Sequence, residues 1–351
     1  MVTPIRIANR LIGPGQPCFI IAEAGVNHNG RMDLAKRLID AAKTAGADAV
    51  KFQTFKAERL AGASAPKAAY QLQTTAHDES QQEMLRRLEL SEADHRELMA
   101  YCAAQDMLFL STPFEEESAD LLERLGVSAF KLPSGELTNL PLLEHVARKG
   151  KPMIMSTGMA TLAEVETAVR TITARGNDTL VLLHCVSQYP ADPSAVNLRA
   201  MRTMMDAFSR PVGYSDHTMG IEIALAAVAM GACVIEKHLT LDRTLPGPDQ
   251  RASLEPDEWA ALVRGIRKIE AALGHGRKEP APGEAETAAV ARKSLVAACD
   301  IPRGRILSES LIAVKRPGTG LPPSMMQEVI GRVVIKHIPA ETVLTMEMFA
   351  S

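Results

Sequence analysis

Short apolar runs and amphipathic helical segments alternate eight times along most of this 351-residue chain, and this alternation constrains the fold more than any other feature. Strands that alternate with helices are typical of a parallel sheet. Eight such units in about 250 residues predict a closed (β/α)8 barrel. We expect its strands at residues 18–22, 49–53, 108–111, 129–132, 153–156, 180–185, 212–215 and 234–238. An open doubly wound sheet is the alternative, but no Gly-x-Gly-x-x-Gly turn follows the first run.

The intervening helices carry recognisable start and stop signals. An apolar stripe that includes Leu38 is followed by Gly46, which predicts the end of the first helix. After the last strand, Pro256 stands among acidic residues, and this composition suits the first turn of a helix. A stripe that begins at Trp259 then continues to Gly274. The barrel domain is therefore predicted to span residues 1–274.

The last part of the chain has a different composition. Residues 275–289 are polar and rich in Gly, Pro and charged residues, which is typical of a linker. Short strands are predicted at 294–298, 313–315 and 333–338. We therefore expect residues 290–351 to form a small, mostly β domain.

Composition excludes several classes of protein. The net charge of −3 provides no general field for nucleic acid or anionic lipid. The five cysteines are scattered and form no C-x-x-C pair, which favours a reducing compartment over a disulfide or zinc scaffold. No signal peptide or membrane span is recognisable. We expect a soluble, cytoplasmic protein.

Polar side chains gather where the predicted strands end, which is where barrel enzymes carry their active sites. In chain order they are Glu23, Asn27, His28, Lys51, Gln53, Ser111, Thr112, Lys131, Ser134, Glu136, Ser156, Thr157, His184, Ser187, Tyr189, Ser215, Asp216, His217, Lys237 and His238. A polar residue at the end of one strand has little diagnostic value, whereas polar residues at the ends of all eight predicted strands predict a functional site.

Two lysines stand inside apolar strands. Lys51 alternates with apolar neighbours, so its side chain is predicted to enter the barrel mouth, and Lys131 repeats this pattern. A lone lysine is more often a solvated surface charge, but two in this setting favour an anion site. With the hydroxyls of Ser134, Ser156 and Ser215 they would form a cradle for phosphate and carboxylate groups.

Two histidines end adjacent strands. The axes of neighbouring strands lie about 4.8 Å apart, so His217 and His238 are within reach of one metal ion. Two imidazoles leave coordination positions open, which suits a catalytic metal. His184 is interpreted as a packing or supporting residue. The remaining histidines are interpreted as structural or solvent-exposed, namely His77, His95, His145, His275 and His337.

Ten ordered motifs resemble those of the sialic acid (nonulosonic acid) synthases, which condense phosphoenolpyruvate with a 2-acetamido sugar. They are IAEAGVNHNG (21–30), KFQTFKA (51–57), STPF (111–114), KLPSGELTNLP (131–141), STGMAT (156–161), LLHC…YP (182–190), GYSDHT (213–218), EKHLTLD (236–242), GPDQRASLEPDE (247–258) and VKRPGTG (314–320). The resemblance spans nearly the whole chain, and residues 290–351 are similar to the antifreeze-like (SAF) domain of that family.

The resemblance implies a role for each candidate residue. His217 and His238 would bind Mn²⁺, with Mg²⁺ or Co²⁺ as alternatives, and Glu23 would handle protons or the attacking water. Lys51 and Lys131 would be catalytic as well as phosphoenolpyruvate-binding. The other implied phosphoenolpyruvate ligands are Ser134, Ser156 and Ser215, and the implied sugar ligands are Gln53, Glu136, Tyr189, Asp249 and Arg316. Arg316 would reach the barrel of the other subunit in a domain-swapped homodimer.

The family implies two sugars. One is N-acetylmannosamine, which would give N-acetylneuraminate and phosphate; the alternative is 2,4-diacetamido-2,4,6-trideoxymannose, which would give N,N'-diacetyllegionaminate. Ser187 and residues 289–294 depart from some relatives near the sugar, and residues 68–85 resemble a substrate-covering loop in both kinds of synthase.

Other functions compete with this interpretation. A Schiff-base aldolase would use Lys51 or Lys131 as its amine, and a non-catalytic carbohydrate- or ice-binding protein would use the C-terminal domain alone. A synthase for a phosphorylated pentose or tetrose is disfavoured by the pairing of GYSDHT with KRPGTG.

Overall fold

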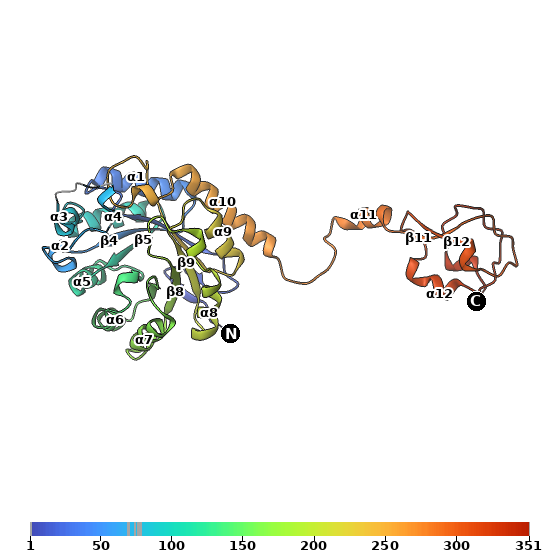
Figure 1. The fold of residues 1–351 in the computed structure, drawn as a ribbon, viewed down its shortest axis with the longest axis horizontal. Helices are drawn as coiled ribbons and strands as arrows, with labels where there is room; N and C mark the ends of the chain where they lie inside the picture. Colours follow the sequence, from blue (N-terminus) through green and yellow to red (C-terminus); the bar gives the residue numbers. More distant parts are fainter. Residues whose placement is uncertain (1, 69–70, 74, 76–78, 351) are drawn as a thin grey trace. The chain divides into compact units, whose positions relative to one another are not determined.

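The computed structural model describes residues 2–68, 71–73, 75 and 79–350. They form two compact units, Met1–Gly274 and His275–Ser351, each of which is described by itself. Figure 1 shows strands enclosed by helices in the first unit. No helix in the described part of the chain is long and apolar enough to cross a membrane.

The first unit is built on an eight-stranded parallel sheet in the order β5-β4-β3-β10-β9-β8-β7-β6. The strands at the two ends of this order, β5 and β6, also lie in contact, so the sheet curls into a ring. The strands are β3 Phe19–Gly25, β4 Ala49–Thr54, β5 Leu108–Pro113, β6 Phe130–Leu132, β7 Met153–Ser156, β8 Leu180–Cys185, β9 Val212–Asp216 and β10 Val234–His238. The predicted (β/α)8 barrel is confirmed, and each predicted strand is found within a few residues of its expected limits.

Helices cover the outside of this ring (Figure 1). They are α1 Met32–Ala45, α4 Glu92–Ala104, α5 Glu116–Leu125, α6 Leu140–Ala147, α7 Leu162–Thr173, α8 Arg199–Phe208, α9 Glu222–Ala229 and α10 Pro256–Leu273, with the shorter α2 Ala57–Leu60 and α3 Gln81–Arg86 after β4. Short 3-10 turns, among them η1 Gln71–Gln73, η2 Ser134–Glu136, η3 Pro193–Ala195 and η4 Gln250–Ala252, join them to the strands. Gly46 ends α1 with a left-handed φ of 85° and donates its N–H to Lys43, as its position predicted.

An antiparallel hairpin that the sequence did not reveal closes the amino-terminal end of the barrel. It consists of β1 Ile5–Ile7 and β2 Arg10–Ile12. Ile7 and Ile12 are fully buried against Phe19, Leu183 and other inward residues at that end. The hairpin therefore fills the base of the barrel with apolar side chains.

His28, which follows β3, is buried in the helix-facing layer rather than in the barrel mouth. Its Nδ1 accepts a hydrogen bond from Gly30 N–H at 3.0 Å, and its Nε2 has no partner among the described residues. Burial and the nearby His95 lower the pKa of His28 to about 4. The buried imidazole is therefore neutral at pH 7.

This histidine should make barrel stability depend on pH. The unfolded chain takes up a proton near pH 6.5, before the folded chain does, so the free energy of unfolding should fall as the pH drops from 6.5 toward 4. The expected loss is about 1.5 kcal/mol between pH 6.5 and 5. Above about pH 7.5, where the histidine is neutral in both states, this contribution is constant. His28→Asn keeps an acceptor for Gly30 but does not titrate, so it should remove this part of the slope. Urea unfolding followed by Trp259 fluorescence, at both pH values, measures the difference; equal slopes in the two proteins would contradict it.

The second unit is small and has its own core. Two antiparallel strands, β11 Ser294–Ala297 and β12 Ile312–Lys315, pack with α12 Met326–Val329 and the 3-10 turns η5 Glu309–Leu311, η6 Pro323–Met325 and η7 Met346–Met348. Leu295, Val329 and Leu344 are fully buried in its centre. These strands agree with two of the three predicted for this part of the chain.

The predicted strand at 333–338 is wrong. Its residues make isolated bridges to three separate segments, with Val333 opposite Ile306, Val334 opposite Phe349 and Ile338 opposite Ile301. Because the backbone partner changes at each step, no continuous ladder forms. The segment predicted as a linker also differs, since helix α11 Glu284–Ala291 occupies part of residues 275–289.

Candidate active site

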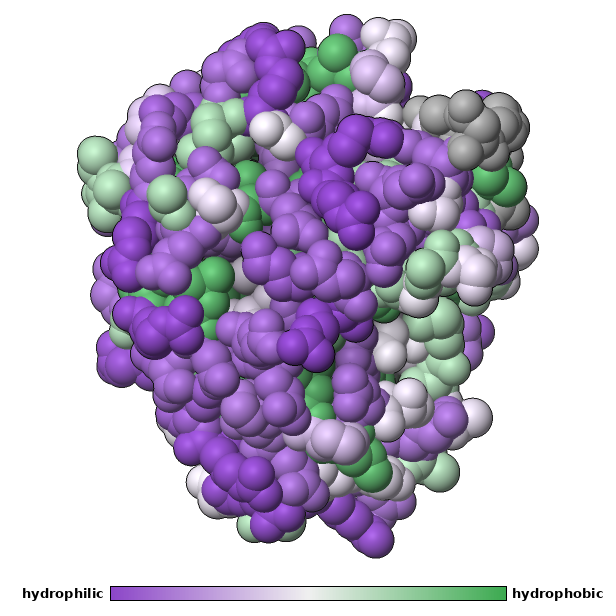
Figure 2. Space-filling model, turned by 90° about the vertical axis from the view of Figure 1, so that its left-hand side faces the viewer, coloured by the Kyte–Doolittle hydropathy of each residue, from purple (hydrophilic) through white to green (hydrophobic). Residues whose placement is uncertain are grey.

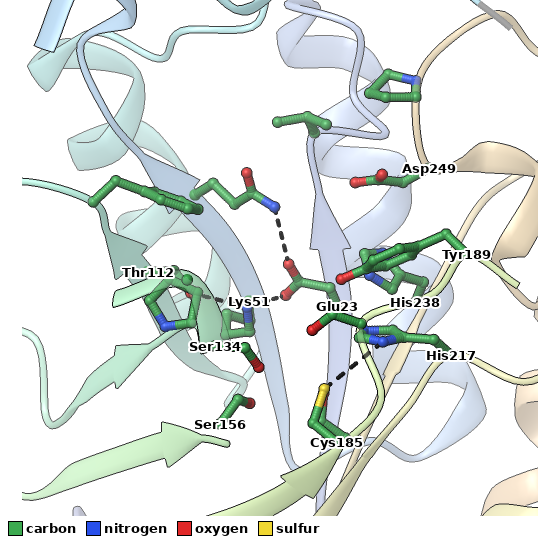
Figure 3. Close-up of a pocket in the computed structure, with 18 of the residues that line it drawn as sticks. Glu23, Lys51, Thr112, Ser134, Ser156, Cys185, Tyr189, His217, His238 and Asp249 are labelled. Carbon is green, nitrogen blue, oxygen red and sulfur yellow. Dashed lines mark hydrogen bonds and ion pairs between the residues drawn. The ribbon is translucent and has the colours of Figure 1, made fainter. Parts of the chain in front are cut away.

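A cavity of about 400 Å³ opens among residues at the carboxyl ends of the barrel strands. Figure 3 shows side chains from several strands converging there, with Lys51 and Ser156 on one side and His217 and His238 on the other. Most of the residues predicted for the site line this cavity. They are Glu23, Lys51, Gln53, Lys131, Ser134, Ser156, Tyr189, Ser215, His217, His238 and Asp249.

Strand register arranges these side chains in layers. His238 is aligned with Glu23, and Glu23 with Lys51, so these three side chains lie at one level of the barrel. Glu236 is aligned with Ile21 and Ser215, two residues closer to the base. The cavity thus has a deeper level and a level nearer the mouth.

Lys51 lies in a network of buried polar groups. Its Nζ is 2.6 Å from Glu23 Oε2, donates to Thr112 Oγ1 at 2.9 Å and lies 3.9 Å from Glu236 Oε2. The Lys51 side chain is only 5% exposed. An ammonium this deeply buried requires such partners, which an anionic substrate would share or replace.

Lys131, on strand β6, contacts the same Glu236 carboxylate as Lys51. Its Nζ donates to Ser156 Oγ at 2.8 Å and lies 3.4 Å from Glu236 Oε1. Ser215 Oγ donates to the same Glu236 oxygen at 3.0 Å. Ser134 lies beside this group and accepts a hydrogen bond from Gly158 N–H at 2.9 Å. The residues predicted to form the cradle therefore lie close together.

Glu236 was not among the residues predicted for the site, yet it connects both lysines. Side chains on a strand alternate between the two faces. Because His238 was expected to point inward, the residue two positions before it should point inward as well. Strand alternation at His238 therefore predicts an inward-facing side chain at Glu236 as well.

The electrostatics follow from burial and from these contacts. Burial would lower the pKa of Lys51, but Glu23 and Glu236 reverse this and raise it. Burial would raise the pKa of Glu236, but Lys131 and Lys51 lower it. Burial raises the pKa of Glu23 to about 7, although Lys51 opposes the shift. Lys51 and Glu236 are therefore held in their charged forms, whereas Glu23 can exchange a proton near neutral pH.

The two imidazoles predicted to hold a metal lie together, with ring centroids 5.5 Å apart. His217 donates its Nδ1–H to the Val186 carbonyl at 2.8 Å, an arrangement that leaves Nε2 as the ligating nitrogen. Burial and the neighbouring His217 lower the pKa of His238 well below its usual value, and its Nδ1 has no hydrogen-bond partner among the described residues. His238 therefore fits the role of a neutral metal ligand. Burial would lower the pKa of His217, but Cys185 reverses this and raises it, so His217 must release a proton when it binds a metal.

These two histidines would not form a closed metal site. No group of three or more His, Cys, Asp or Glu side chains suited to a metal occurs in residues 2–68, 71–73, 75 and 79–350. A cation on His217 and His238 would complete its coordination with water or substrate oxygens, as catalytic sites do.

Other predicted sugar ligands lie beside the imidazoles. The Tyr189 ring is 4.1 Å from that of His217 and 5.8 Å from that of His238. Asp249 is buried, and burial raises the pKa of its carboxyl to about 6 against the effects of His217 and Lys51. Gln53 donates to Glu23 Oε1 at 3.4 Å, which connects this side to the lysine network.

Two predicted sugar ligands are found elsewhere. Glu136 does not line the cavity; it lies in η2, and its carboxylate accepts a hydrogen bond from Asn139 Nδ2 at 2.7 Å. Arg316 belongs to the second unit, where its Nε donates to the Ala291 carbonyl at 3.0 Å.

Several polar strand ends serve the fold instead of the cavity. The Asn27 side chain donates to the Leu239 carbonyl at 2.8 Å, and His184 contacts the Val196 carbonyl at 2.7 Å. Asp216 and Lys237 form an ion pair of 2.6 Å with no exposure to solvent. Ser111 and Thr157 are also buried and do not line the cavity. His77 and part of 68–85 lie outside the described residues.

Comparison with known proteins identifies the family. The NeuB family model matches residues 38–278, and the SAF domain model matches residues 292–350. The chain is 50% identical to an N,N'-diacetyllegionaminic acid synthase of Campylobacter jejuni, over 91% of this chain and 96% of that protein. It is 49% identical to a Legionella pneumophila protein of the same name, over 95% of both chains.

A solved structure agrees with these matches. The N-acetylneuraminic acid (sialic acid) synthetase of Leptospira borgpetersenii superposes with a TM-score of 0.74 and 39% identity, covering 82% of this chain and 95% of that one. The chain is therefore a synthase of the NeuB family, with a barrel followed by an SAF domain.

Proposed function

We propose that the chain condenses phosphoenolpyruvate with the open-chain aldehyde of a 2-acetamido sugar, adds water and releases inorganic phosphate. The observation that carries this proposal is that two buried lysines, three serines and a pair of imidazoles line the same cavity. Cationic and hydroxyl groups suit the phosphate and carboxylate of one substrate. The imidazoles suit a metal beside the carbonyl of the other.

Each group of residues would have a distinct task. Lys51, Lys131, Ser134, Ser156 and Ser215 would bind and orient phosphoenolpyruvate between the level of Lys51 and the deeper level of Ser215, and Gln53, Tyr189 and Asp249 would hold the sugar. A divalent cation on His217 and His238, with Mn²⁺ as our first choice, would supply Lewis-acid polarisation of the aldehyde. Carbon 3 of phosphoenolpyruvate forms a bond to the aldehyde carbon, and water adds to the resulting cationic carbon 2. The tetrahedral product then loses phosphate and becomes a ketone.

Glu23 would serve proton transfer in this sequence. Its carboxyl lies at the level of His238 and Lys51, next to both proposed substrate positions. A raised pKa of about 7 allows it to accept a proton from the incoming water and return it at neutral pH.

For the sugar, we propose 2,4-diacetamido-2,4,6-trideoxymannose as the preferred substrate, with N-acetylmannosamine as the second candidate. The support is the identity of 49–50% to two proteins named N,N'-diacetyllegionaminic acid synthase, against 39% to the sialic acid synthetase of known structure. We also propose that Arg316 of the partner subunit completes the sugar site in a homodimer. Activity in mixed dimers of Glu23→Gln and Arg316→Ala subunits tests this arrangement.

Product analysis tests the condensation. With phosphoenolpyruvate, a 2-acetamido sugar and Mn²⁺, we expect one phosphate released for each nine-carbon sugar acid detected by mass spectrometry. Chelation should stop both products, and Mn²⁺ should restore them. Full turnover in protein shown to be metal-free by elemental analysis would overturn the role of the metal while leaving the condensation intact.

One observation favours a second candidate, a Schiff-base aldolase. Burial lowers the pKa of Lys131 despite the nearby Glu236, and a lysine with a lowered pKa is a better nucleophile. Borohydride reduction in the presence of either substrate separates the two functions. A covalent adduct on Lys131 would support the aldolase, and an unmodified, active protein would support the synthase.

A further inference from the structure

A satellite hydrophobic cluster borders the cavity on one side. Five of its side chains line the cavity and are here called the apolar wall: Val26, Leu60, Met84, Leu85 and Phe114. They follow β3, β4 and β5 in the chain, so the apolar wall lies on one arc of the barrel mouth, where Gln71 and Gln81 also line the cavity. The cluster therefore forms part of the binding surface as well as the core beneath the loops.

The apolar wall is held in place by contacts behind it. The Phe114 ring packs edge to face on Phe55, with centroids 5.9 Å apart. Gln82 on α3 donates a 2.8 Å hydrogen bond to the carbonyl of Ala61, the residue that follows α2. This bond connects the two short helices. Met84 is only 2% exposed, so its side chain is fixed by packing. The surface offered to a ligand is thus preformed.

The position of the wall determines which part of a ligand it can meet. Around the ring, β3, β4 and β5 lie consecutively, and the imidazoles stand at β9 and β10. If the sugar aldehyde lies at the imidazoles, as the proposed function requires, the sugar chain extends from there across the mouth. Its far end can then contact the arc formed by the loops after β3, β4 and β5.

We infer that the apolar wall receives the terminal carbon of the sugar as a methyl group, and that it selects a 6-deoxy sugar over one with a terminal hydroxyl. This inference rests on the proposed function. A hydroxyl against these hydrocarbon side chains would lose its hydrogen bonds to water and gain none from them. A hydrophobic pocket discriminates against an added hydroxyl by a factor of about 10–100, which sets the expected selectivity.

The wild-type protein can be tested with a pair of sugars that differ by one oxygen. We expect kcat/KM to be about 10–100 times higher for 2-acetamido-2,6-dideoxymannose than for N-acetylmannosamine, with phosphoenolpyruvate held saturating. Equal values for the two sugars would overturn the inference but leave the condensation established. Failure of every sugar, including the 2,4-diacetamido compound, would overturn the proposed function itself.

Variants assign the selectivity to the wall. Leu60→Asn places an amide in the half-buried part of the wall and should reduce the ratio at least threefold, mainly by raising activity on N-acetylmannosamine. Met84→Gln has nearly the same shape and should act in the same direction. Leu140→Asn is the matched control, since Leu140 is also half-buried near the barrel mouth but does not line the cavity. An unchanged ratio in both wall variants, with thermal unfolding showing that they are folded, would also overturn the inference.

Discussion

Replacing Lys237 by methionine should lower the free energy of unfolding of the barrel by about 3–5 kcal/mol, because it leaves a buried carboxylate without its cation. Lys237 Nζ lies 2.6 Å from Asp216 Oδ2 and donates to the Thr218 carbonyl at 2.6 Å. Tyr214 and Thr218 donate to the other Asp216 oxygen. Neither partner of the ion pair is exposed, so solvent cannot compensate for the loss.

The same ion pair should control the metal site. Asp216 immediately precedes His217, and Lys237 immediately precedes His238, so the pair joins β9 to β10 behind both imidazoles. Loss of a residue that supports metal ligands typically lowers metal affinity by about 10–100-fold. We expect this loss in Lys237→Met and also in Asp216→Asn/Lys237→Met, where removal of both charges should recover part of the stability.

Separate measurements distinguish the two effects. Urea unfolding gives the stability, and titration of the metal-free protein with Mn²⁺ gives the affinity without any turnover. Lys149→Met provides the control, because Lys149 is a mostly buried lysine paired with Asp120 and Glu123 on helix α5, remote from both histidines in the chain. It should lose stability but keep its Mn²⁺ affinity. Unchanged affinity in Lys237→Met would show that the ion pair supports the fold alone.

Glu23→Gln should lower kcat by about 10²–10⁴-fold, the usual contribution of a positioned acid or base. The amide keeps the shape of the side chain and can still accept from Gln53, but it cannot take up a proton. In this variant Lys51 Nζ retains its hydrogen bond to Thr112 Oγ1 at 2.9 Å and its ion pair with Glu236 Oε2 at 3.9 Å. The phosphate cradle should therefore persist, and KM for phosphoenolpyruvate should change little.

Steady-state phosphate release measures both constants. Glu166→Gln is the matched carboxylate-to-amide control, since Glu166 is an exposed residue of helix α7 that does not line the cavity, and it should keep kcat within about threefold of wild type, as expected for a surface change. Retention of more than a tenth of kcat in Glu23→Gln would exclude proton transfer by this residue.

The sequence predicted the barrel well because its signals are local. Buried parallel strands are short apolar runs, and Gly46 and Gly274 mark the ends of helices α1 and α10. The hairpin of β1 and β2 was missed because three-residue strands carry too little pattern to recognise. Residues 333–338 were assigned wrongly because apolar alternation cannot reveal that successive residues pair with different segments.

For the site, motifs and strand alternation located most of the cavity residues. They could not predict for every polar residue whether its side chain faces the cavity or the surrounding helices. Asp216 and Lys237 stand next to inward residues in polar motifs, yet they face the helical layer. The Glu136 carboxylate is directed toward Asn139 because it accepts a local hydrogen bond from that side chain. The apolar wall could not be predicted at all, since residues from three loops meet only in the folded chain.

The hairpin of β1 and β2 has a kinetic consequence. Because Ile7 and Ile12 seal the base of the barrel, both substrates and both products must pass through the same mouth. The lysine cradle reaches the deeper level, whereas Gln53, Tyr189 and Asp249 stand nearer the opening. A sugar bound first would obstruct the path to the cradle. The closed base thus favours compulsory order, with phosphoenolpyruvate entering before the sugar.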